Sequence, residues 1–237
     1  MEPLSPLLKE ARSPLLAPKP QSRKPPEALA RAAGFRLIAG VDEAGRGPWA
    51  GPVVAAAVVV SRRLPRVRID DSKRLTPAQR ERAYYAILEH ARVGVGIVHA
   101  ARIDAENIRQ ATLRAMEEAV AHLARRPDLV LVDGRDVPSV SVPCWPIIGG
   151  DRLSYPIACA SIIAKVTRDS LMVFYHRLFP EYRFDAHKGY GTPAHRDALR
   201  LHGPSPLHRM SFRPLAASLD SARDAALSGV ERAASSS

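Results

Sequence analysis

The sequence predicts an α/β fold in which a mixed central sheet is covered by helices. Short apolar runs rich in β-branched residues fall at Arg36–Val41 and Val53–Val60, as is typical of strands. Longer segments follow in which apolar residues recur three or four positions apart, as is typical of helices. Strand and helix signals alternate across residues 35–215 without an internal repeat, so a single domain is expected.

The remaining elements follow from local signals. A helix is expected over Thr76–Ala91, because Thr76 can cap it, Pro77 suits its first position, and Tyr84, Ile87 and Leu88 share a face. Two prolines, Pro143 and Pro146, place one further strand near an edge of the sheet. The other predicted elements are strands at Val93–Val98, Asp128–Val132 and Val140–Ile148, one or two helices in Asp104–Leu123, and helices at Ile157–Phe179 and Thr192–Leu201.

Both ends of the chain are expected to lie outside the domain. Residues 1–34 repeat proline and basic residues with no lasting period, which predicts a disordered tail. We interpret this tail as a solvated linker; the alternative is an arm that adds non-specific attraction to phosphates. Residues 216–237 end in "AASSS" and are expected to form a partly disordered tail.

Composition limits the class of protein. The 237 residues carry a formal net charge of +11, which suits a polyanionic partner, either nucleic acid or an anionic membrane. The longest apolar run, Val53–Val60, is too short to cross a bilayer, and no basic amphipathic helix favours a membrane surface. Cys144 and Cys159 lack metal-binding spacing and lie among apolar residues, so they are expected to be buried free thiols. With no secretory signal, this predicts a cytoplasmic protein.

Four carboxylates occupy unusual positions. Asp42 and Glu43 close the first strand, Asp133 closes the strand "LVLV", and Asp169 lies inside the long helix. Because an isolated carboxylate beside a core needs a partner, the group indicates a divalent cation such as Mg²⁺ or Mn²⁺. The alternative is structural: the first three would be turn residues, and Asp169 would pair with Lys165 one turn earlier.

A glycine-rich turn follows the first two carboxylates at once. It lacks the helix and the spacing of a dinucleotide-binding motif, since Pro48 and a second strand follow. Gly45 and Gly47 leave the backbone open, and Arg46 can bind a phosphate, although most glycine turns serve only as turns. Lys73, just before a helix, is a second candidate for a phosphate contact, and a solvated loop charge is the alternative.

A histidine-rich segment follows the long helix. Tyr190 stands between two glycines, which suggests a ring presented for stacking; the alternative is a surface loop with this ring packed on the core. The histidines match no zinc pattern. The neighbouring cations that would suit a nucleic-acid backbone are His187, Lys188, His195, His202, His208 and Arg209.

With these motifs in view, the sequence closely resembles ribonuclease HII, the type 2 ribonuclease H family. The combination of "DEAGRG" with the later "AKVTRD" and "HKGYGT" is highly specific. The matching stretches, in family order over residues 36–215, are "GVDEAGRGPWAGPVVAAAVV", "DSKRLT", "LVDG", "YPIACASIIAKVTRD", "HKGYGTPAHRDAL" and "HRMSF".

The resemblance implies an RNase H-like fold with a C-terminal helical part. It implies an endonuclease that depends on Mn²⁺ or Mg²⁺ and cuts the RNA strand of RNA–DNA hybrids and DNA duplexes that contain single ribonucleotides. The ends would be a 3′-hydroxyl and a 5′-phosphate. The implied metal-binding and catalytic residues are Asp42, Glu43, Asp133 and Asp169, and the expected substrate contacts are Gly45, Arg46, Gly47, Lys73, Lys165 and Tyr190.

Within this resemblance, the glycine turn would read the 2′-hydroxyl through its backbone, and Tyr190 would stack on the neighbouring deoxyribose. Ribonuclease HIII, the nearest related family, carries a folded N-terminal domain for which the tail is too short. Two rival classes are a non-catalytic nucleic-acid-binding domain, for which four carboxylates would be unfavourable, and a structure-selective DNA nuclease such as a Holliday-junction resolvase. A monomer is expected by default.

Overall fold

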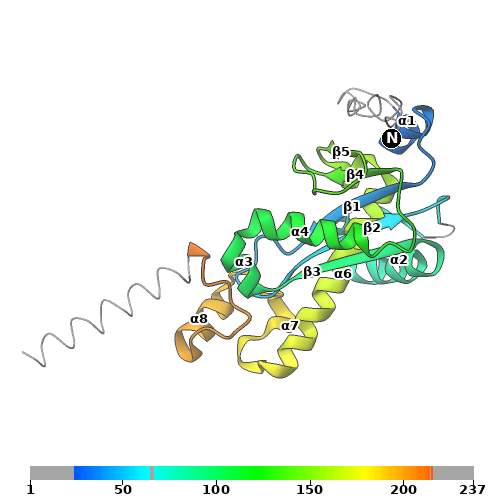
Figure 1. The fold of residues 1–237 in the computed structure, drawn as a ribbon. Coiled ribbons are helices and arrows are strands. Elements are labelled where there is room, and N and C mark those ends of the chain that lie inside the picture. The colour runs from blue at the N-terminus through cyan, green and yellow to red at the C-terminus, as the bar shows by residue number, and fades with distance from the viewer. Residues whose placement is uncertain (1–23, 65–66, 214, 216–237) are drawn as a thin grey trace, which may run out of the picture.

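The computed structural model describes residues 24–64, 67–213 and 215 (Figure 1). The predicted tails at 1–23 and 216–237 lie outside these residues. The strands are β1 (Ile38–Ala44), β2 (Val53–Val59), β3 (Arg92–Val98), β4 (Leu129–Asp133) and β5 (Cys144–Ile147), and the helices are α1 (Pro26–Ala32), η2 (Ser72–Arg74), α2 (Pro77–His90), α3 (Ala100–Glu106), α4 (Ile108–Ala121), α5 (Gly150–Leu153), α6 (Tyr155–Leu178), η3 (Pro180–Tyr182), α7 (Phe184–His187) and α8 (Pro193–His202).

The five strands form one mixed sheet in the order β3-β2-β1-β4-β5. β1 pairs antiparallel with β2, and β2 pairs antiparallel with β3. β4 runs parallel to β1 on one side and to β5 on the other. The mixed α/β sheet of the prediction is confirmed, and the carboxyl ends of β1 and β4 meet at the same edge of the sheet.

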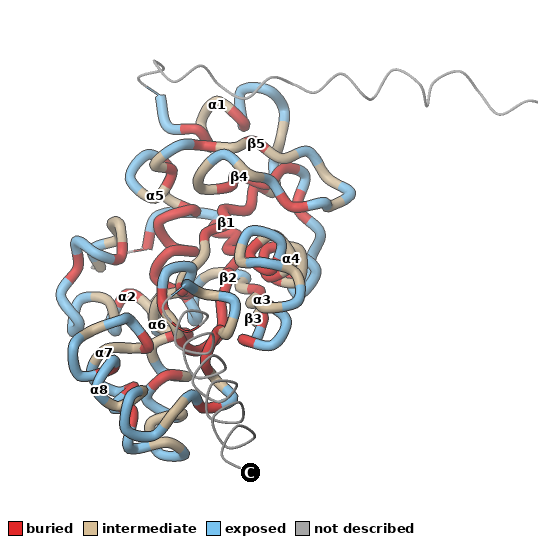
Figure 2. Tube along the Cα trace, turned by 90° about the vertical axis from the view of Figure 1, so that its left-hand side faces the viewer, coloured by how far each residue is buried: buried red, intermediate tan, exposed pale blue. Residues whose placement is uncertain are grey.

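Helices cover both faces of the sheet. On one face α4 packs against alternate residues of β1, β2 and β4 in a continuous apolar cluster. On the other face α6 and α2 pack against the intervening residues, and the start of α6 packs on β4 and β5. Figure 2 shows the result: the buried chain is concentrated in the sheet and in the first part of α6, between exposed outer helices. α7 and α8 form the helical part beyond the end of α6.

Glycines let the helices lie very close to the sheet. A β-carbon at Gly40 in β1 would collide with the backbone of Pro156 and Ile157 at the start of α6. β-Carbons at Gly94 and Gly96 in β3 would collide in the same way with the backbone of α4. The separation of each helix from the sheet is therefore set by backbone contact as well as by side chains.

The outer edge of β3 is hydrogen-bonded by side chains of α4 and the residue after it. The Ile97 N–H donates to the Glu118 carboxylate over 3.3 Å, and the His122 ring Nδ1 lies 2.7 Å from the Val95 carbonyl oxygen. Edge groups that would otherwise face water are thus bonded within the chain.

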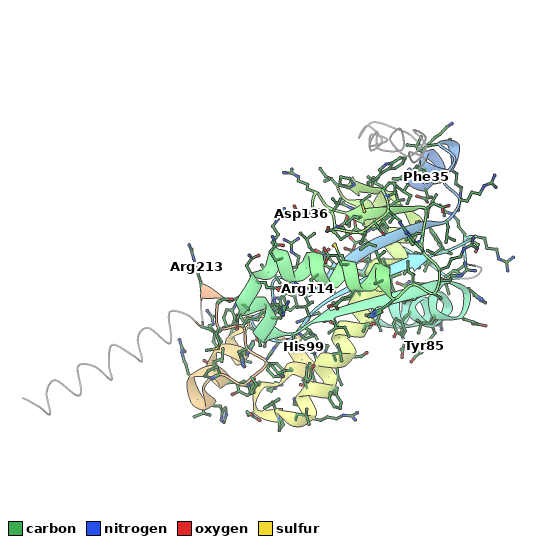
Figure 3. All side chains as sticks on the ribbon, viewed as in Figure 1. Phe35, Tyr85, His99, Arg114, Asp136 and Arg213 are labelled. Atoms are coloured by element: carbon green, nitrogen blue, oxygen red, sulfur yellow. The ribbon has the colours of Figure 1, made fainter. Side chains whose placement is uncertain are left out.

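The predicted N-terminal tail is corrected by α1. Residues 26–32, expected to be irregular, form a helix whose Ala30 is fully buried beside β4 and β5. The Glu27 carboxylate accepts the Tyr155 backbone N–H over 3.2 Å and so caps α6 from a distant part of the chain. Phe35 lies at this end of the sheet (Figure 3), where its ring meets Trp145 edge-on at 5.8 Å. The domain therefore begins before residue 35.

Other predicted elements agree with the structure apart from their ends. Thr76 and Gln79 form a capping box at the start of α2, but Leu88 is 45% exposed and does not share the buried face of Ile87. The expected strand 140–148 shortens to β5, which is an edge strand as its prolines indicated. Cys144 and Cys159 are free thiols, and Cys144 is only partly buried. Within the described residues, no helix has the length and apolar character needed to cross a membrane.

Candidate active site

The site is built where α6 runs alongside β1. Gly40 lies against Ile157, Asp42 is hydrogen-bonded by Ser161, and Gly45 lies against Arg168. The five residue steps from 40 to 45 and the eleven helical steps from 157 to 168 each span about 16 Å, so the contacts between the two segments advance together. This match brings Ser161 and Lys165 of the helix beside the carboxylate-bearing end of the strand.

A cavity of about 500 Å³ opens at this end of the sheet. Three of the predicted carboxylates, Asp42, Glu43 and Asp133, lie in its wall. All six predicted substrate contacts do so too: Gly45, Arg46, Gly47, Lys73, Lys165 and Tyr190. These predicted residues thus come from five separate segments of the sequence and line the same cavity. The remaining lining residues are Ala44, Ser72, Asp151, Ser161 and Arg168.

Asp42 is the most deeply placed carboxylate, with 6% of the residue exposed. Burial raises its pKa well above the usual range, and the nearby charges of Glu43 and Asp133 raise this pKa further. Hydrogen bonds from Ser161 and from the Glu43 backbone N–H oppose this rise. None of the ion pairs among the described residues includes Asp42, so its negative charge lacks a side-chain cation in contact.

The other carboxylates of the cavity are held individually. Burial raises the pKa of Glu43, against the effect of Arg46, whose guanidinium lies 3.3 Å from the Glu43 carboxylate. Asp133 accepts the Gly150 backbone N–H over 2.6 Å, which ties β4 to α5. Burial and the charge of Asp133 raise the pKa of Asp151, the second residue of α5. Four carboxylates therefore share one wall.

Asp151 takes the place that the sequence prediction gave to Asp169. Asp169 is not among the cavity-lining residues, and its carboxylate forms an ion pair with Lys165 at 2.9 Å. It lies eight residues beyond Ser161, about 12 Å further along the helix axis than the level of Asp42. The prediction that Asp169 joins the carboxylate cluster is therefore wrong for this structure, and the ion-pair alternative holds. A signal for Asp151 was present: "GGD" follows the strand next to β4.

The glycine turn is held from behind by two buried arginines. Arg209, fully buried, donates to the carbonyl oxygens of Gly45, Arg46 and Gly51 over 2.5–3.0 Å. Arg168, 1% exposed, donates to the carbonyl oxygens of Ala50 and Pro52. Burial, followed by the charge of Arg168, lowers the pKa of Arg209 to about 9. Because the carbonyl groups are bound on the inside, the turn keeps a fixed backbone beside the cavity.

This burial corrects one expectation from the sequence. Arg209, His195 and His208 were expected to contact a nucleic-acid backbone, yet each is at most 2% exposed. Their polar atoms are bonded within the protein, as burial requires. Tyr190, by contrast, is 46% exposed and lies in the cavity wall opposite Gly47, whose added β-carbon would lie 3.7 Å from its ring.

The donor set of the cavity fits a hard divalent cation. Its four carboxylates supply the oxygen ligands that Mg²⁺ and Mn²⁺ prefer. Burial, and after it the charges of neighbouring carboxylates, raise the pKa values of Asp42, Glu43 and Asp151. Within the described part of the chain, no three His, Cys, Asp or Glu side chains are already closed around one point. Glu43 is paired with Arg46 through Oε1, and Asp133 accepts the Gly150 N–H through Oδ1, so one oxygen of each carboxylate already has a partner.

The fold and the site together define a nucleic-acid hydrolase: a mixed α/β sheet with carboxylates at the ends of adjacent parallel strands, beside a cavity with basic and glycine-rich walls. Comparison with known proteins narrows this class. The family model for ribonuclease HII matches residues 39–214. The chain therefore belongs to the ribonuclease HII family, which cuts the RNA strand of RNA–DNA hybrids.

Individual relatives agree with this assignment. The ribonuclease HII of Chloroflexus aggregans is 51% identical over 198 residues, which cover 80% of this chain and 92% of that protein. The crystal structure of ribonuclease H2 from Pyrococcus horikoshii is similar with a TM-score of 0.66 at 27% identity, over 75% of this chain and 94% of that one. The Bst ribonuclease HIII structure in complex with Mn²⁺ shares the fold, with a TM-score of 0.60 at 19% identity over 82% and 73% of the two chains. The RNase H-like fold of the prediction is confirmed.

Proposed function

We propose that this nuclease cuts on the 5′ side of single ribonucleotides embedded in duplex DNA, as well as within longer hybrids, and leaves 3′-hydroxyl and 5′-phosphate ends. The observation that carries the proposal is the cavity, in which a carboxylate cluster, an open glycine turn and an exposed tyrosine face the same space. Cutting at such sites would give the enzyme a role in ribonucleotide excision repair. That role and a cytoplasmic location remain predictions.

The carboxylates would hold Mg²⁺ or Mn²⁺; the Mn²⁺ bound by the related ribonuclease HIII supports a divalent ion without choosing between the two. We assign the ligands to Asp42, Glu43, Asp133 and Asp151, because these four share the cavity. Two such ions would supply an activated water molecule and stabilise the leaving oxygen. Asp169 is assigned instead to holding Lys165, a residue that lines the cavity.

The glycine turn and Tyr190 would choose the position of the cut. A 2′-hydroxyl both donates and accepts hydrogen bonds, and the backbone of Gly45, Arg46 and Gly47 can approach it closely. Tyr190 would stack on the deoxyribose next to the ribonucleotide, and this would favour a junction between the two sugars. Arg46, Lys73 and Lys165 would bind phosphates around that junction.

The test is cleavage of a labelled DNA duplex that carries one ribonucleotide, with Mg²⁺ or Mn²⁺, beside an all-DNA duplex. We expect a cut 5′ of the ribonucleotide that is lost on chelation and in Asp151→Asn. Asp169→Asn is the matched control and should retain most of the activity. If Asp169→Asn abolishes cutting while Asp151→Asn does not, the assignment of the ligands is reversed.

The variant Gly47→Ala tests whether the turn recognises the ribose, separately from any effect on folding. The added methyl has space in the free protein, where its nearest neighbour would be the Tyr190 ring at 3.7 Å, but it would stand where the sugar approaches. Gly45→Ala differs, because Gly45 has a φ of +98° and lies against Arg168. We expect Gly47→Ala to unfold at the wild-type temperature and to cut poorly; wild-type activity would contradict this role for the turn.

The proposal also includes action as a monomer. Sedimentation equilibrium with and without substrate measures this directly, and activity confined to a dimeric fraction would overturn it.

A further inference from the structure

Three histidine rings form a cluster behind Tyr190. His195 and His208 are buried, and His187 stacks on His195 with ring centroids 4.5 Å apart and an angle of 14° between the rings. The Nε2 atoms of His195 and His208 lie 2.9 Å apart, within hydrogen-bond distance. Their position away from solvent excludes a direct contact with substrate.

The proton on His208 can be placed from its backbone partner. The Ser205 backbone N–H lies 2.9 Å from the His208 Nδ1 atom, and a backbone N–H can only donate. The Ser205 carbonyl oxygen lies farther from Nδ1, at 3.3 Å, and the Ser205 hydroxyl at 2.9 Å can donate to it as well. Nδ1 is therefore an acceptor without a proton. In a neutral ring the proton is then on Nε2, which faces His195.

The proton on His195 follows from the opposite end of the pair. Its Nδ1 atom lies 2.9 Å from the carbonyl oxygen of Tyr190, and a carbonyl can only accept. Nδ1 therefore carries the proton, and Nε2 of the neutral ring is an acceptor facing the donor on His208. This arrangement of protons requires both rings to be neutral. A charged His195 would point its Nε2–H at the Nε2–H of His208, and a charged His208 would point its Nδ1–H at the Ser205 N–H. Burial lowers the pKa of each ring to about 4, so both are neutral at pH 7.

Separate hydrogen bonds to His187, which stacks on His195, hold the backbone before Tyr190. The Tyr190 N–H donates to the His187 carbonyl oxygen, and the Gly189 N–H donates to His187 Nδ1. Gly189 lies against the Ala50 backbone, where a β-carbon would collide. The backbone of Tyr190 is thus fixed while its ring stays exposed in the cavity.

We propose that His208 and His195 are positioning residues, which act as a neutral relay of hydrogen bonds from the Ser205 N–H to the Tyr190 carbonyl and so fix the Tyr190 ring against the substrate. The inference rests on the proposed function, in which Tyr190 contacts the sugar beside the ribonucleotide. The substrate-binding ring would then depend on the segment after α8, which also carries Arg209.

Amide side chains offer matched variants at both positions. An asparagine amide reaches the place of the ring Nδ1, and a glutamine amide reaches that of Nε2. His195→Asn keeps a donor for the Tyr190 carbonyl, whereas His195→Gln loses it. At position 208 the order is reversed, because His208→Gln keeps a donor toward His195 and His208→Asn does not.

The measurement is the KM and kcat of each variant on the single-ribonucleotide duplex with Mn²⁺. We expect KM to rise about 10-fold in His195→Gln and His208→Asn, with a much smaller change in kcat. KM should rise less in His195→Asn and His208→Gln, because each of these keeps the hydrogen-bond donor that points toward Tyr190. If side-chain volume alone determined KM, the same amide would be the better substitute at both positions. That outcome would overturn the relay, and so would a fall in kcat alone.

A double-mutant cycle with Tyr190→Ala tests whether the effect passes through Tyr190. We expect His195→Gln to add nothing to KM once Tyr190 is alanine; a fully additive effect would refute the inference. If Tyr190→Ala alone leaves KM unchanged, the proposed function of this ring fails and the positioning role fails with it. If Tyr190→Ala raises KM but the reversed order of the amide variants is absent, the relay alone fails. The ¹⁵N shifts of the histidines report the protonated nitrogens independently of activity.

Discussion

The packing of Gly40 against α6 gives a prediction whose size can be worked from the structure. In Gly40→Ala, the added β-carbon would lie 2.5 Å from the Pro156 carbonyl oxygen and closer still to the backbone nitrogen of Ile157. Ordinary contacts of this kind begin at 3.4 Å, so α6 must move away from β1 by about 1 Å.

This displacement should affect both stability and activity. Overpacking against backbone is expected to cost about 3 kcal/mol, which corresponds to a fall in Tm of about 6–12 °C for a domain of this size. α6 also carries Ser161 and Lys165 into the cavity, and an error of about 1 Å in such a site can reduce the rate about 100-fold.

Gly96→Ala is the matched control. Its added β-carbon would collide with the backbone of Ala115 in α4, with the carbonyl carbon at 2.9 Å and the oxygen closer. The steric clash is similar to that of Gly40→Ala, but it displaces α4, on the opposite face of the sheet from α6. Scanning calorimetry should show a similar fall in Tm for the two variants. Their activity is measured by single-turnover cutting at a temperature well below both unfolding transitions.

The two variants should then differ in activity. Only Gly40→Ala should cut slowly when fully folded. An equal loss of activity in both variants would show that the rate follows general stability, and would refute the reasoning that the spacing between β1 and α6 sets the site. Wild-type Tm in Gly40→Ala would refute the steric argument itself.

Three further predictions concern the surroundings of the site. Asp42→Asn should raise the Tm of the metal-free protein at neutral pH, since the raised pKa means that the buried charge opposes folding; the difference from wild type should shrink as the pH falls through that pKa toward 3.8, and a growing difference would contradict the sign. Arg209→Met should cost about 3 kcal/mol or more in urea unfolding, because carbonyl oxygens of the glycine turn lose their donor; an unchanged midpoint would exclude this support. Glu27→Ala should cost about 1 kcal/mol through loss of the cap on Tyr155, with Glu27→Gln as the control that keeps an acceptor, and equal stability of the two would remove the capping role.

The sequence predicts the parts of this protein that depend on local pattern. The strand that carries Asp133 ends with its apolar run, β1 continues past Val41 to Ala44, and Thr76 marks the start of α2 by its capping side chain. The parallel pairing of β1 and β4 then brings the two aspartates to one edge. The strands and the helix start are encoded within a few neighbouring residues, whereas the pairing of β1 with β4 joins distant segments.

The parts that were missed depend on distance between segments. α5 is a single turn that follows the left-handed Gly149, too short to leave a periodic pattern, so Asp151 gave no helical signal. Asp169 sits in a strong family motif, but its distance along α6 from Asp42 depends on how the helix lies on the strand. Glu27 and Arg209 likewise take their roles from partners far away in sequence.

The side chains that bond the outer edge of β3 bear on how this protein associates with other copies. A strand that joined the sheet at this edge would need the Ile97 N–H and the Val95 carbonyl, which already bond to Glu118 and His122. It would have to break both bonds before forming its own. α4 thus stabilises the core with one face. Glu118 of α4 and His122, the residue after it, make growth of the sheet into a fibre or a strand-exchanged dimer unfavourable at this edge.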